Sequence, residues 1–323
     1  MGYGITGSNP QRSAHNKTAR RSSVRKNIEF KTTDGVTLRG WHFIPDGVSG
    51  PVPTVVMAHG FSATKEIFLD KYAELFAQSG IASLVYDHRN LGASDGEPRQ
   101  EIDPWAQING YRDAITFAES LPETDASRIG VFGSSYSGGH VLVVGAIDRR
   151  VKCVVSQVPL VDGPRNAQRV IPAHLMSGMR AMFDADRRDR FFGKPPVRLP
   201  VVSNDGSPCA LPTTDSYEFM VNVAGRATDT WINEVTLRSV EMFMEYDPGA
   251  YIALISPTPL LMLVQREDHL TIADLALAAY EEARQPKKLI TMPGGHFAAY
   301  IDNFATAGPG ARDWFVEYLQ PAQ

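Results

Sequence analysis

The stretch "FGSSYSGGHV", residues 132 to 141, holds three serines and three glycines in ten positions and directly follows an apolar run. Serine and glycine are common in loops, in phosphate-binding turns and in the tight turn that carries a catalytic nucleophile. No Lys-Ser or Lys-Thr pair follows the glycines as in a P-loop, and the G-x-G-x-x-G spacing of a dinucleotide site is absent. Because a strand pattern precedes the turn and a helix pattern follows it, the stretch predicts a nucleophile elbow.

Two serines can occupy the nucleophile position of this elbow. Ser135 has Gly133 two residues before it but Ser137 two residues after it, whereas Ser137 has Gly139 after it but Ser135 before it. Neither serine therefore matches G-x-S-x-G strictly. We favour Ser135, because it lies two residues beyond the predicted strand and because Ser137 is small enough for the later position in the turn.

Strand and helix patterns alternate around the elbow. Strand patterns occur at residues 53–60, 81–89, 128–133, 151–159, 258–268 and 287–296. Helical patterns occur at residues 65–80, 104–122, 136–147, 272–284 and 310–319. Residues 24–45 precede them and predict a hairpin that turns at Asp34-Gly35. This order predicts an α/β fold with a mostly parallel, doubly wound sheet, whose ligands bind at the carboxyl ends of the strands.

The alternation breaks at about residue 163 and resumes near residue 258. We therefore predict a core formed by residues 27–162 and 251–323, with an inserted, largely helical cap at residues 163–250. The insert contains a Met-rich amphipathic stretch at 173–192 and a second helical stretch at 231–246. Residues 1–26 are basic and lack acidic side chains, so we expect them to form a disordered arm.

A serine hydroxyl is a weak nucleophile until a base removes its proton, so the elbow needs partners. In this architecture an acid and then a histidine follow the serine, each at the carboxyl end of a later strand. Asp268, with Glu267 as the alternative, follows one such strand, and His296 follows the next. Asp162 marks a second possible position for the acid. We predict a catalytic triad of Ser135, Asp268 and His296.

The stretch "MAHGFSATKE", residues 57 to 66, supplies a His-Gly turn after another predicted strand. Such a turn exposes backbone N–H groups, and the residue after the nucleophile supplies a further one. We predict that the N–H groups of Phe61 and Tyr136 form an oxyanion hole. His59 belongs to this turn, and His140 lies in the helix after the elbow, where we expect a structural role.

Composition and charge exclude several classes of function. A formal charge of −4 gives no basic field for nucleic acid, and no stretch is long and apolar enough to span a membrane. Two cysteines are too few for a disulfide framework or a zinc site, which favours a cytoplasmic setting. We expect a small-molecule substrate and neither a cofactor nor a metal. The sequence is also compatible with a homo-oligomer.

Taken together, the hairpin, the His-Gly turn, the elbow and the ordered triad resemble an α/β-hydrolase over about residues 27–320. Within that superfamily, "HGFSATK", "YDHRNLGASDGEPR" and "GSSYSGGHV" are similar to a branch related to dienelactone hydrolases and X-prolyl dipeptidyl peptidases. This branch includes fungal polyketide transferases and thiohydrolases. The chain departs from the peptidases in two respects: it has no room for their large C-terminal β-domain, and Phe61 stands where a tyrosine donor is expected.

These observations predict a cofactor-free serine hydrolase that cleaves or transfers an acyl group from an ester or thioester. Met176, Met179 and Met182 recur every third residue in the insert and are candidates for an adaptable substrate pocket, although the same spacing also fits core packing. Alternative functions are an X-prolyl peptidase or amidase, a non-catalytic small-molecule binding protein, and a lyase or cyclase on the same fold.

Overall fold

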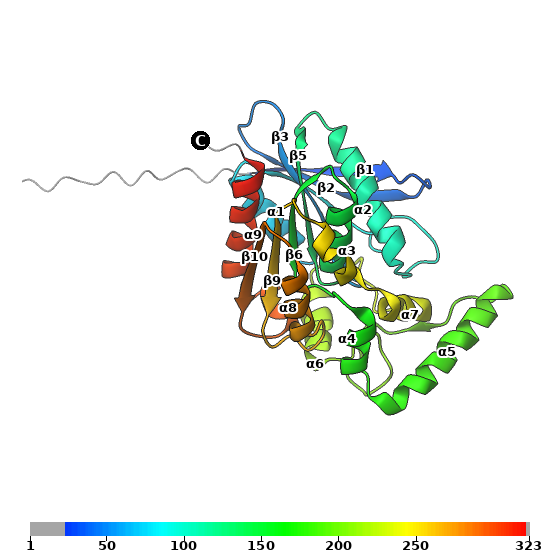
Figure 1. Ribbon diagram of the computed structural model, residues 1–323. Coiled ribbons are helices and arrows are strands. Elements are labelled where there is room, and N and C mark those ends of the chain that lie inside the picture. The colour runs from blue at the N-terminus through cyan, green and yellow to red at the C-terminus, as the bar shows by residue number, and fades with distance from the viewer. Residues whose placement is uncertain (1–22, 321–323) are drawn as a thin grey trace, which may run out of the picture.

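The computed structural model describes residues 23–320, which form one large sheet covered by helices on both faces (Figure 1). The eight strands of this sheet follow the order β1-β2-β4-β3-β5-β6-β9-β10. β2 is antiparallel to both of its neighbours, and all other neighbouring strands are parallel. The predicted α/β class with a mostly parallel, doubly wound sheet is confirmed.

The first two strands form the predicted hairpin at one edge of the sheet. β1 (Ser23–Lys31) pairs with β2 (Thr37–Pro45), and Gly35 takes a φ of 89° in the turn between them. β1 begins four residues before the predicted start of the core at residue 27, so residues 23–26 belong to the sheet. Residues 1–22 of the predicted arm lie outside the described residues.

The parallel strands are the apolar runs that the sequence predicted. They are β3 (Val52–Ala58), β4 (Ala82–Tyr86), β5 (Thr124–Ser134), β6 (Val151–Gln157), β9 (Leu260–Gln265) and β10 (Lys287–Met292). β4 and β9 are buried along their whole length, as expected for parallel strands that are covered on both faces. Their carboxyl ends meet at one edge of the sheet.

Two helical layers enclose this sheet. Helices α2 (Pro104–Glu119), α3 (Tyr136–Ile147) and α8 (Ala273–Glu282) contribute to one apolar core. Helices α1 (Leu69–Gln78) and α9 (Phe304–Leu319) contribute to the second core on the other face. α3 has the predicted bounds, whereas α9 begins six residues earlier than expected and contains Pro309.

The long interval between β6 and β9 is largely helical, as predicted. Its elements are α4 (Gly163–Val170), α5 (Ala173–Phe191), β7 (Arg198–Leu199), α6 (Thr214–Tyr217), the π-helix η1 (Glu218–Ala224), β8 (Val235–Thr236), α7 (Leu237–Glu245) and the 3₁₀-helix η2 (Pro248–Leu254). The predicted helical stretch at 231–246 is shorter than expected, because Thr236 caps α7 by accepting a hydrogen bond from the Ser239 N–H. The domain bounds stay a prediction.

Within residues 23–320, no helix is long and apolar enough to cross a membrane.

Candidate active site

The turn between β5 and α3 has the geometry expected of an elbow. Ser135 lies between the two elements with φ 60° and ψ −117°, a backbone conformation that few non-glycine residues adopt. Gly133 precedes it by two residues, and a Cβ atom at that position would lie 2.0 Å from the Ser137 carbonyl oxygen. Glycine is therefore needed there, because two backbone segments of the turn meet without room for a side chain.

Three predicted residues from distant parts of the chain lie in one hydrogen-bonded row. His296, in the 3₁₀-helix η3 (His296–Tyr300) after β10, places its Nε2 atom 3.0 Å from the Ser135 Oγ atom. Its Nδ1 atom lies 2.7 Å from Oδ2 of Asp268, which follows β9. Asp268 and His296 are buried, so little water competes for these bonds.

Four donors or potential donors surround the Asp268 carboxylate. Its Oδ1 atom accepts hydrogen bonds from the N–H groups of Leu270 and Thr271, both at 2.9 Å. Its Oδ2 atom lies 2.9 Å from the Thr271 hydroxyl and 2.7 Å from His296 Nδ1. This arrangement suits an ionised carboxylate, which only accepts hydrogen bonds. Thr271 has no place in the sequence prediction, although a threonine three residues after the acid was a visible signal.

The two alternative acids have other partners. Glu267 is exposed and accepts a hydrogen bond from the Gly294 N–H. Asp162 caps α4, where its carboxylate accepts a hydrogen bond of 2.8 Å from the Arg165 N–H. Neither carboxylate contacts His296 in the part of the chain that the structure describes.

Ser137, the alternative nucleophile, is fully buried, and its hydroxyl bonds to His59 and His88 rather than to His296. Its hydroxyl donates a hydrogen bond of 2.5 Å to the His59 carbonyl oxygen and lies 2.8 Å from His88 Nε2. The hydroxyl hydrogen points to His59, so the oxygen accepts from the N–H of His88. Ser137 thus connects the first turn of α3 with two loops at the carboxyl ends of β3 and β4.

The hydrogen bonds of His59 and His88 define which ring nitrogens carry hydrogen. The backbone N–H of His88 donates to His59 Nε2 at 3.1 Å, so the His59 ring carries its hydrogen on Nδ1, 3.0 Å from the Gly60 carbonyl oxygen. Burial lowers the pKa of both histidines, which keeps both rings neutral at ordinary pH.

The turn after β3 lies directly against the candidate nucleophile. A Cβ atom on Gly60 would lie 2.8 Å from the Ser135 Cβ atom, so this close approach depends on glycine. Neither the Phe61 N–H nor the Tyr136 N–H donates to an acceptor within residues 23–320. Both predicted oxyanion donors are thus left without a protein partner.

An ion pair holds the loop that follows this turn. The buried Asp87 carboxylate accepts hydrogen bonds from the Lys65 N–H at 2.7 Å and from the Lys65 ammonium at 2.8 Å. Although burial opposes the charge on Lys65, the Asp87 and Glu66 carboxylates raise the pKa of this lysine. The ion pair connects the loop after β4 to the loop after β3.

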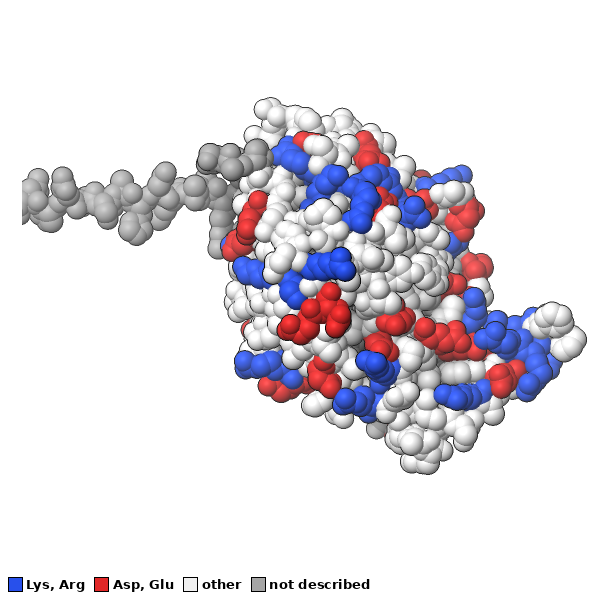
Figure 2. Space-filling view, in the orientation of Figure 1, with Lys and Arg blue, Asp and Glu red and all other residues white. Residues whose placement is uncertain are grey.

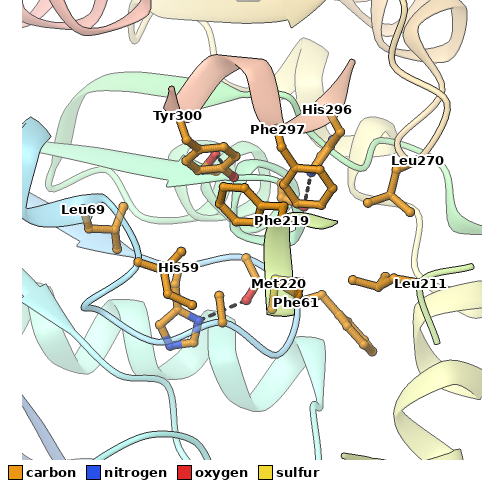
Figure 3. Close-up of a pocket in the computed structure, with 15 residues that line it drawn as sticks. His59, Phe61, Leu69, Leu211, Phe219, Met220, Leu270, His296, Phe297 and Tyr300 are labelled. Carbon is orange, nitrogen blue, oxygen red and sulfur yellow. Dashed lines mark hydrogen bonds between the residues drawn. The ribbon is translucent and has the colours of Figure 1, made fainter. Parts of the chain in front are cut away.

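A small apolar cavity lies beside Ser135 and His296 (Figure 3). Its volume is about 30 Å³, whereas pockets that hold drug-sized ligands enclose roughly 300–1,000 Å³. The rings of Phe219 and Phe297 stack with centroids 4.3 Å apart at its wall. The apolar lining consists of Phe61, Ala63, Ile67, Leu69, Leu211, Phe219, Met220, Leu270 and Phe297.

The three methionines that we predicted as a substrate pocket lie elsewhere. Met176, Met179 and Met182 are all on α5, which projects away from the sheet in Figure 1. Met182 is 49% exposed, Met179 packs on the small apolar cluster around Phe183, and none of the three lines the cavity. Met220 of η1, another methionine of the insert, lines it.

No group of three or more His, Cys, Asp or Glu side chains between residues 23 and 320 is arranged to hold a metal ion.

Comparisons with known proteins identify the family of this chain. The family model described as X-Pro dipeptidyl-peptidase (S15 family) matches residues 34–182. A thiohydrolase of Eupenicillium brefeldianum is 35% identical over 83% of this chain and 85% of its own length. Polyketide transferase grgF of Penicillium sp is 32% identical over 84% of this chain and 89% of its own length.

A solved structure extends the similarity to three dimensions. The crystal structure of the α/β-hydrolase GrgF from Penicillium sp. sh18 is 29% identical in sequence and superposes with a TM-score of 0.79, covering 92% of this chain and 99% of that one. The sheet order and these matches define an enzyme of the α/β-hydrolase class, with hydrolase or acyl transferase activity. The chain belongs to the S15-related branch of this superfamily, together with fungal thiohydrolases and polyketide transferases.

Proposed function

We propose that this enzyme is a serine hydrolase that cleaves or transfers an acyl group from an ester or thioester through an acyl-enzyme. The observation that carries the proposal is the row Ser135–His296–Asp268, with distances of 3.0 and 2.7 Å. Hydrogen bonds of this length suit a base that removes the serine proton and an acid that orients the base.

In the proposed reaction, the Ser135 Oγ atom attacks the acyl carbonyl carbon while His296 Nε2 takes the hydroxyl proton. Asp268 holds the imidazole by its Nδ1–H group and stabilises the imidazolium that forms. When the tetrahedral intermediate collapses, His296 returns the proton to the leaving alcohol or thiol. Water or another nucleophile then releases the acyl group by the same route.

The negative oxygen of the intermediate is assigned to the Phe61 and Tyr136 N–H groups. The unpartnered state of both amides and the close contact between Gly60 and Ser135 support this assignment. Donors that are already in place stabilise developing charge without reorganising, and removal of one such donor costs about 10²–10³-fold in turnover.

The lining of the cavity supports an apolar acyl substrate. Its side chains include none of Asp, Glu, Lys or Arg, so it offers no carboxylate for the ammonium group of an X-prolyl peptide. The relatives named thiohydrolase and polyketide transferase point the same way. We therefore rank acyl esters and thioesters above the X-prolyl peptidase and above a non-catalytic binding protein.

Two free thiols within the described residues, Cys153 and Cys209, support the cytoplasmic setting proposed from composition.

Labelling and turnover test the proposal. A fluorophosphonate probe should label the wild-type protein and not S135A, because the probe needs an activated serine. S135A should lose turnover by a factor on the order of 10⁶, while its circular dichroism spectrum stays unchanged.

Substrate class is tested on the same preparations by comparing kcat/KM for medium-chain thioesters and esters with kcat/KM for X-Pro amides. A clear preference for the amides, or equal labelling of the wild type and S135A, would contradict the proposal.

A further inference from the structure

The loop that follows β6 contains the most unusual backbone conformation beside the site. Val158 has a φ of 38°, and a β-branched residue in the left-handed region is a genuine outlier. Such a conformation is unfavourable and persists only where the surroundings hold it in place. Ser135, with a φ of 60°, is the neighbouring strained residue.

Backbone hydrogen bonds to β9 and to the turn at Ser135 hold this loop in place. The Val158 N–H donates to the Leu263 carbonyl oxygen of β9 at 2.7 Å. The residues around Val158 bind both backbone groups of the candidate nucleophile: the Ser135 N–H donates to Gln157 at 2.8 Å, and the Ser135 carbonyl accepts from the Leu160 N–H at 3.1 Å. The loop therefore fixes Ser135 relative to the strand that precedes the acid.

The carbonyl group of Val158 continues this connection to the acid side of the site. It lies 3.0 Å from the Thr271 hydroxyl oxygen, which also lies 2.9 Å from Asp268 Oδ2 and 3.1 Å from His296 Nδ1. Thr271 and Val158 are buried, so water does not replace these contacts. The Thr271 hydroxyl thus contacts Asp268, His296 and the loop that is hydrogen-bonded to Ser135.

We propose that Thr271 is a positioning residue that holds the Asp268–His296 pair in line with Ser135, anchored by the strained Val158 carbonyl. The single hydroxyl hydrogen has two acceptors, the Val158 carbonyl and the Asp268 carboxylate, and an oxygen lone pair faces the His296 Nδ1–H. With either acceptor, the oxygen stays in one place and restricts rotation of the imidazole. The inference rests on the proposed function of Ser135, Asp268 and His296.

The hydroxyl and the methyl group of Thr271 are separated by two substitutions. Thr271→Val keeps the volume and removes the hydroxyl, whereas Thr271→Ser keeps the hydroxyl and removes a methyl group. Because small misplacements of reacting groups cost up to about 10²-fold, we expect T271V to lower kcat by roughly 10- to 100-fold with KM within about twofold. T271S should retain kcat within about threefold of wild type.

A control variant tests whether the loss of another buried threonine hydroxyl also lowers kcat. Thr236 is fully buried and caps α7 in the insert, whereas Thr271 follows β9 in the core. T236V should lower the melting temperature, because it removes a helix cap, and leave kcat close to wild type.

The kcat and KM values of these variants are measured by steady-state kinetics on the full chain, with the ester or thioester that gives the highest wild-type rate. The proposal is overturned if T271V keeps wild-type kcat, if T271S loses as much as T271V, or if only KM changes. A failure of the proposed function has a different signature, since S135A would then keep its turnover whatever the Thr271 variants do.

Discussion

Replacing Ser137 by alanine tests whether this serine has a structural role or is the nucleophile. The side chain is fully buried, and its hydroxyl bonds to the His59 carbonyl at 2.5 Å and to His88 Nε2 at 2.8 Å. Alanine leaves both groups buried without a partner. An unsatisfied buried polar group costs about 1–3 kcal/mol, so S137A should lower the free energy of unfolding by about 2–6 kcal/mol.

Ser156 provides a matched control, because it is equally buried and its hydroxyl makes one hydrogen bond of 2.8 Å, to the Gly138 carbonyl oxygen of α3. S156A should cost only about 1 kcal/mol, since that carbonyl also takes part in the helix. Urea denaturation followed by tryptophan fluorescence measures both changes, and turnover is measured below the unfolding transition.

We expect the folded S137A protein to keep turnover within about tenfold of wild type, because Ser135, His296 and Asp268 remain hydrogen-bonded. A loss as large as that of S135A would identify Ser137 as the nucleophile. Equal stability of S137A and S156A would refute the reasoning from the two hydrogen bonds.

Three further predictions concern the acid, the buried histidines and the first strand. D268N should lower kcat by about 10⁴-fold, because asparagine favours the wrong tautomer of His296. D162N should have little effect on kcat, because asparagine also caps helices. The reverse result in steady-state assays would identify Asp162 as the acid. Burial lowers the pKa of His140 to about 3 and holds that of His88 well below 6.5. Below about pH 6.5 only the unfolded chain binds protons at these two histidines, so the free energy of unfolding decreases as the pH is lowered. From pH 7 to 5.5 the loss should be about 1.3 kcal/mol for each histidine, measured by urea denaturation; a flat profile would contradict their neutral state. Deleting residues 1–26 should lower the melting temperature more than deleting residues 1–22, because only the longer deletion removes Ser23 to Lys26 from their pairing with β2 and breaks the Lys26–Glu123 ion pair; equal melting temperatures would show that these pairs do not contribute.

The fold could be predicted from the sequence because local patterns determine it. Each parallel strand is a short apolar run followed by small or polar residues, and the carboxyl ends of such strands meet at one edge. This rule alone brings Ser135, Asp268 and His296 together, although they are distant in the chain. Helix α3 had its predicted bounds because the elbow fixes its start and Asp148 its end.

The rest of the site depends on contacts that no local pattern encodes. Ser137 resembles a nucleophile in sequence, and only the packing of the loops after β3 and β4 shows its hydroxyl already bound to His59 and His88. The cavity is lined by Phe219 and Met220 of the π-helix η1, whose position depends on how the insert folds back over the sheet. The methionine spacing in α5 predicted a pocket, but Met182 is 49% exposed and Met179 packs on the cluster around Phe183.

The stacked rings of Phe219 and Phe297 bear on the apparent dissociation constant that a binding experiment on this enzyme measures. With about 30 Å³ free beside Ser135, there is room for one or two water molecules and none for an acyl chain. For a ligand that needs more space than this, the apparent dissociation constant is the intrinsic one divided by the fraction of molecules in which the space is open. Two homologous enzymes with the same contacts to the acyl chain can thus differ in affinity, solely because their aromatic pairs separate at different equilibrium frequencies.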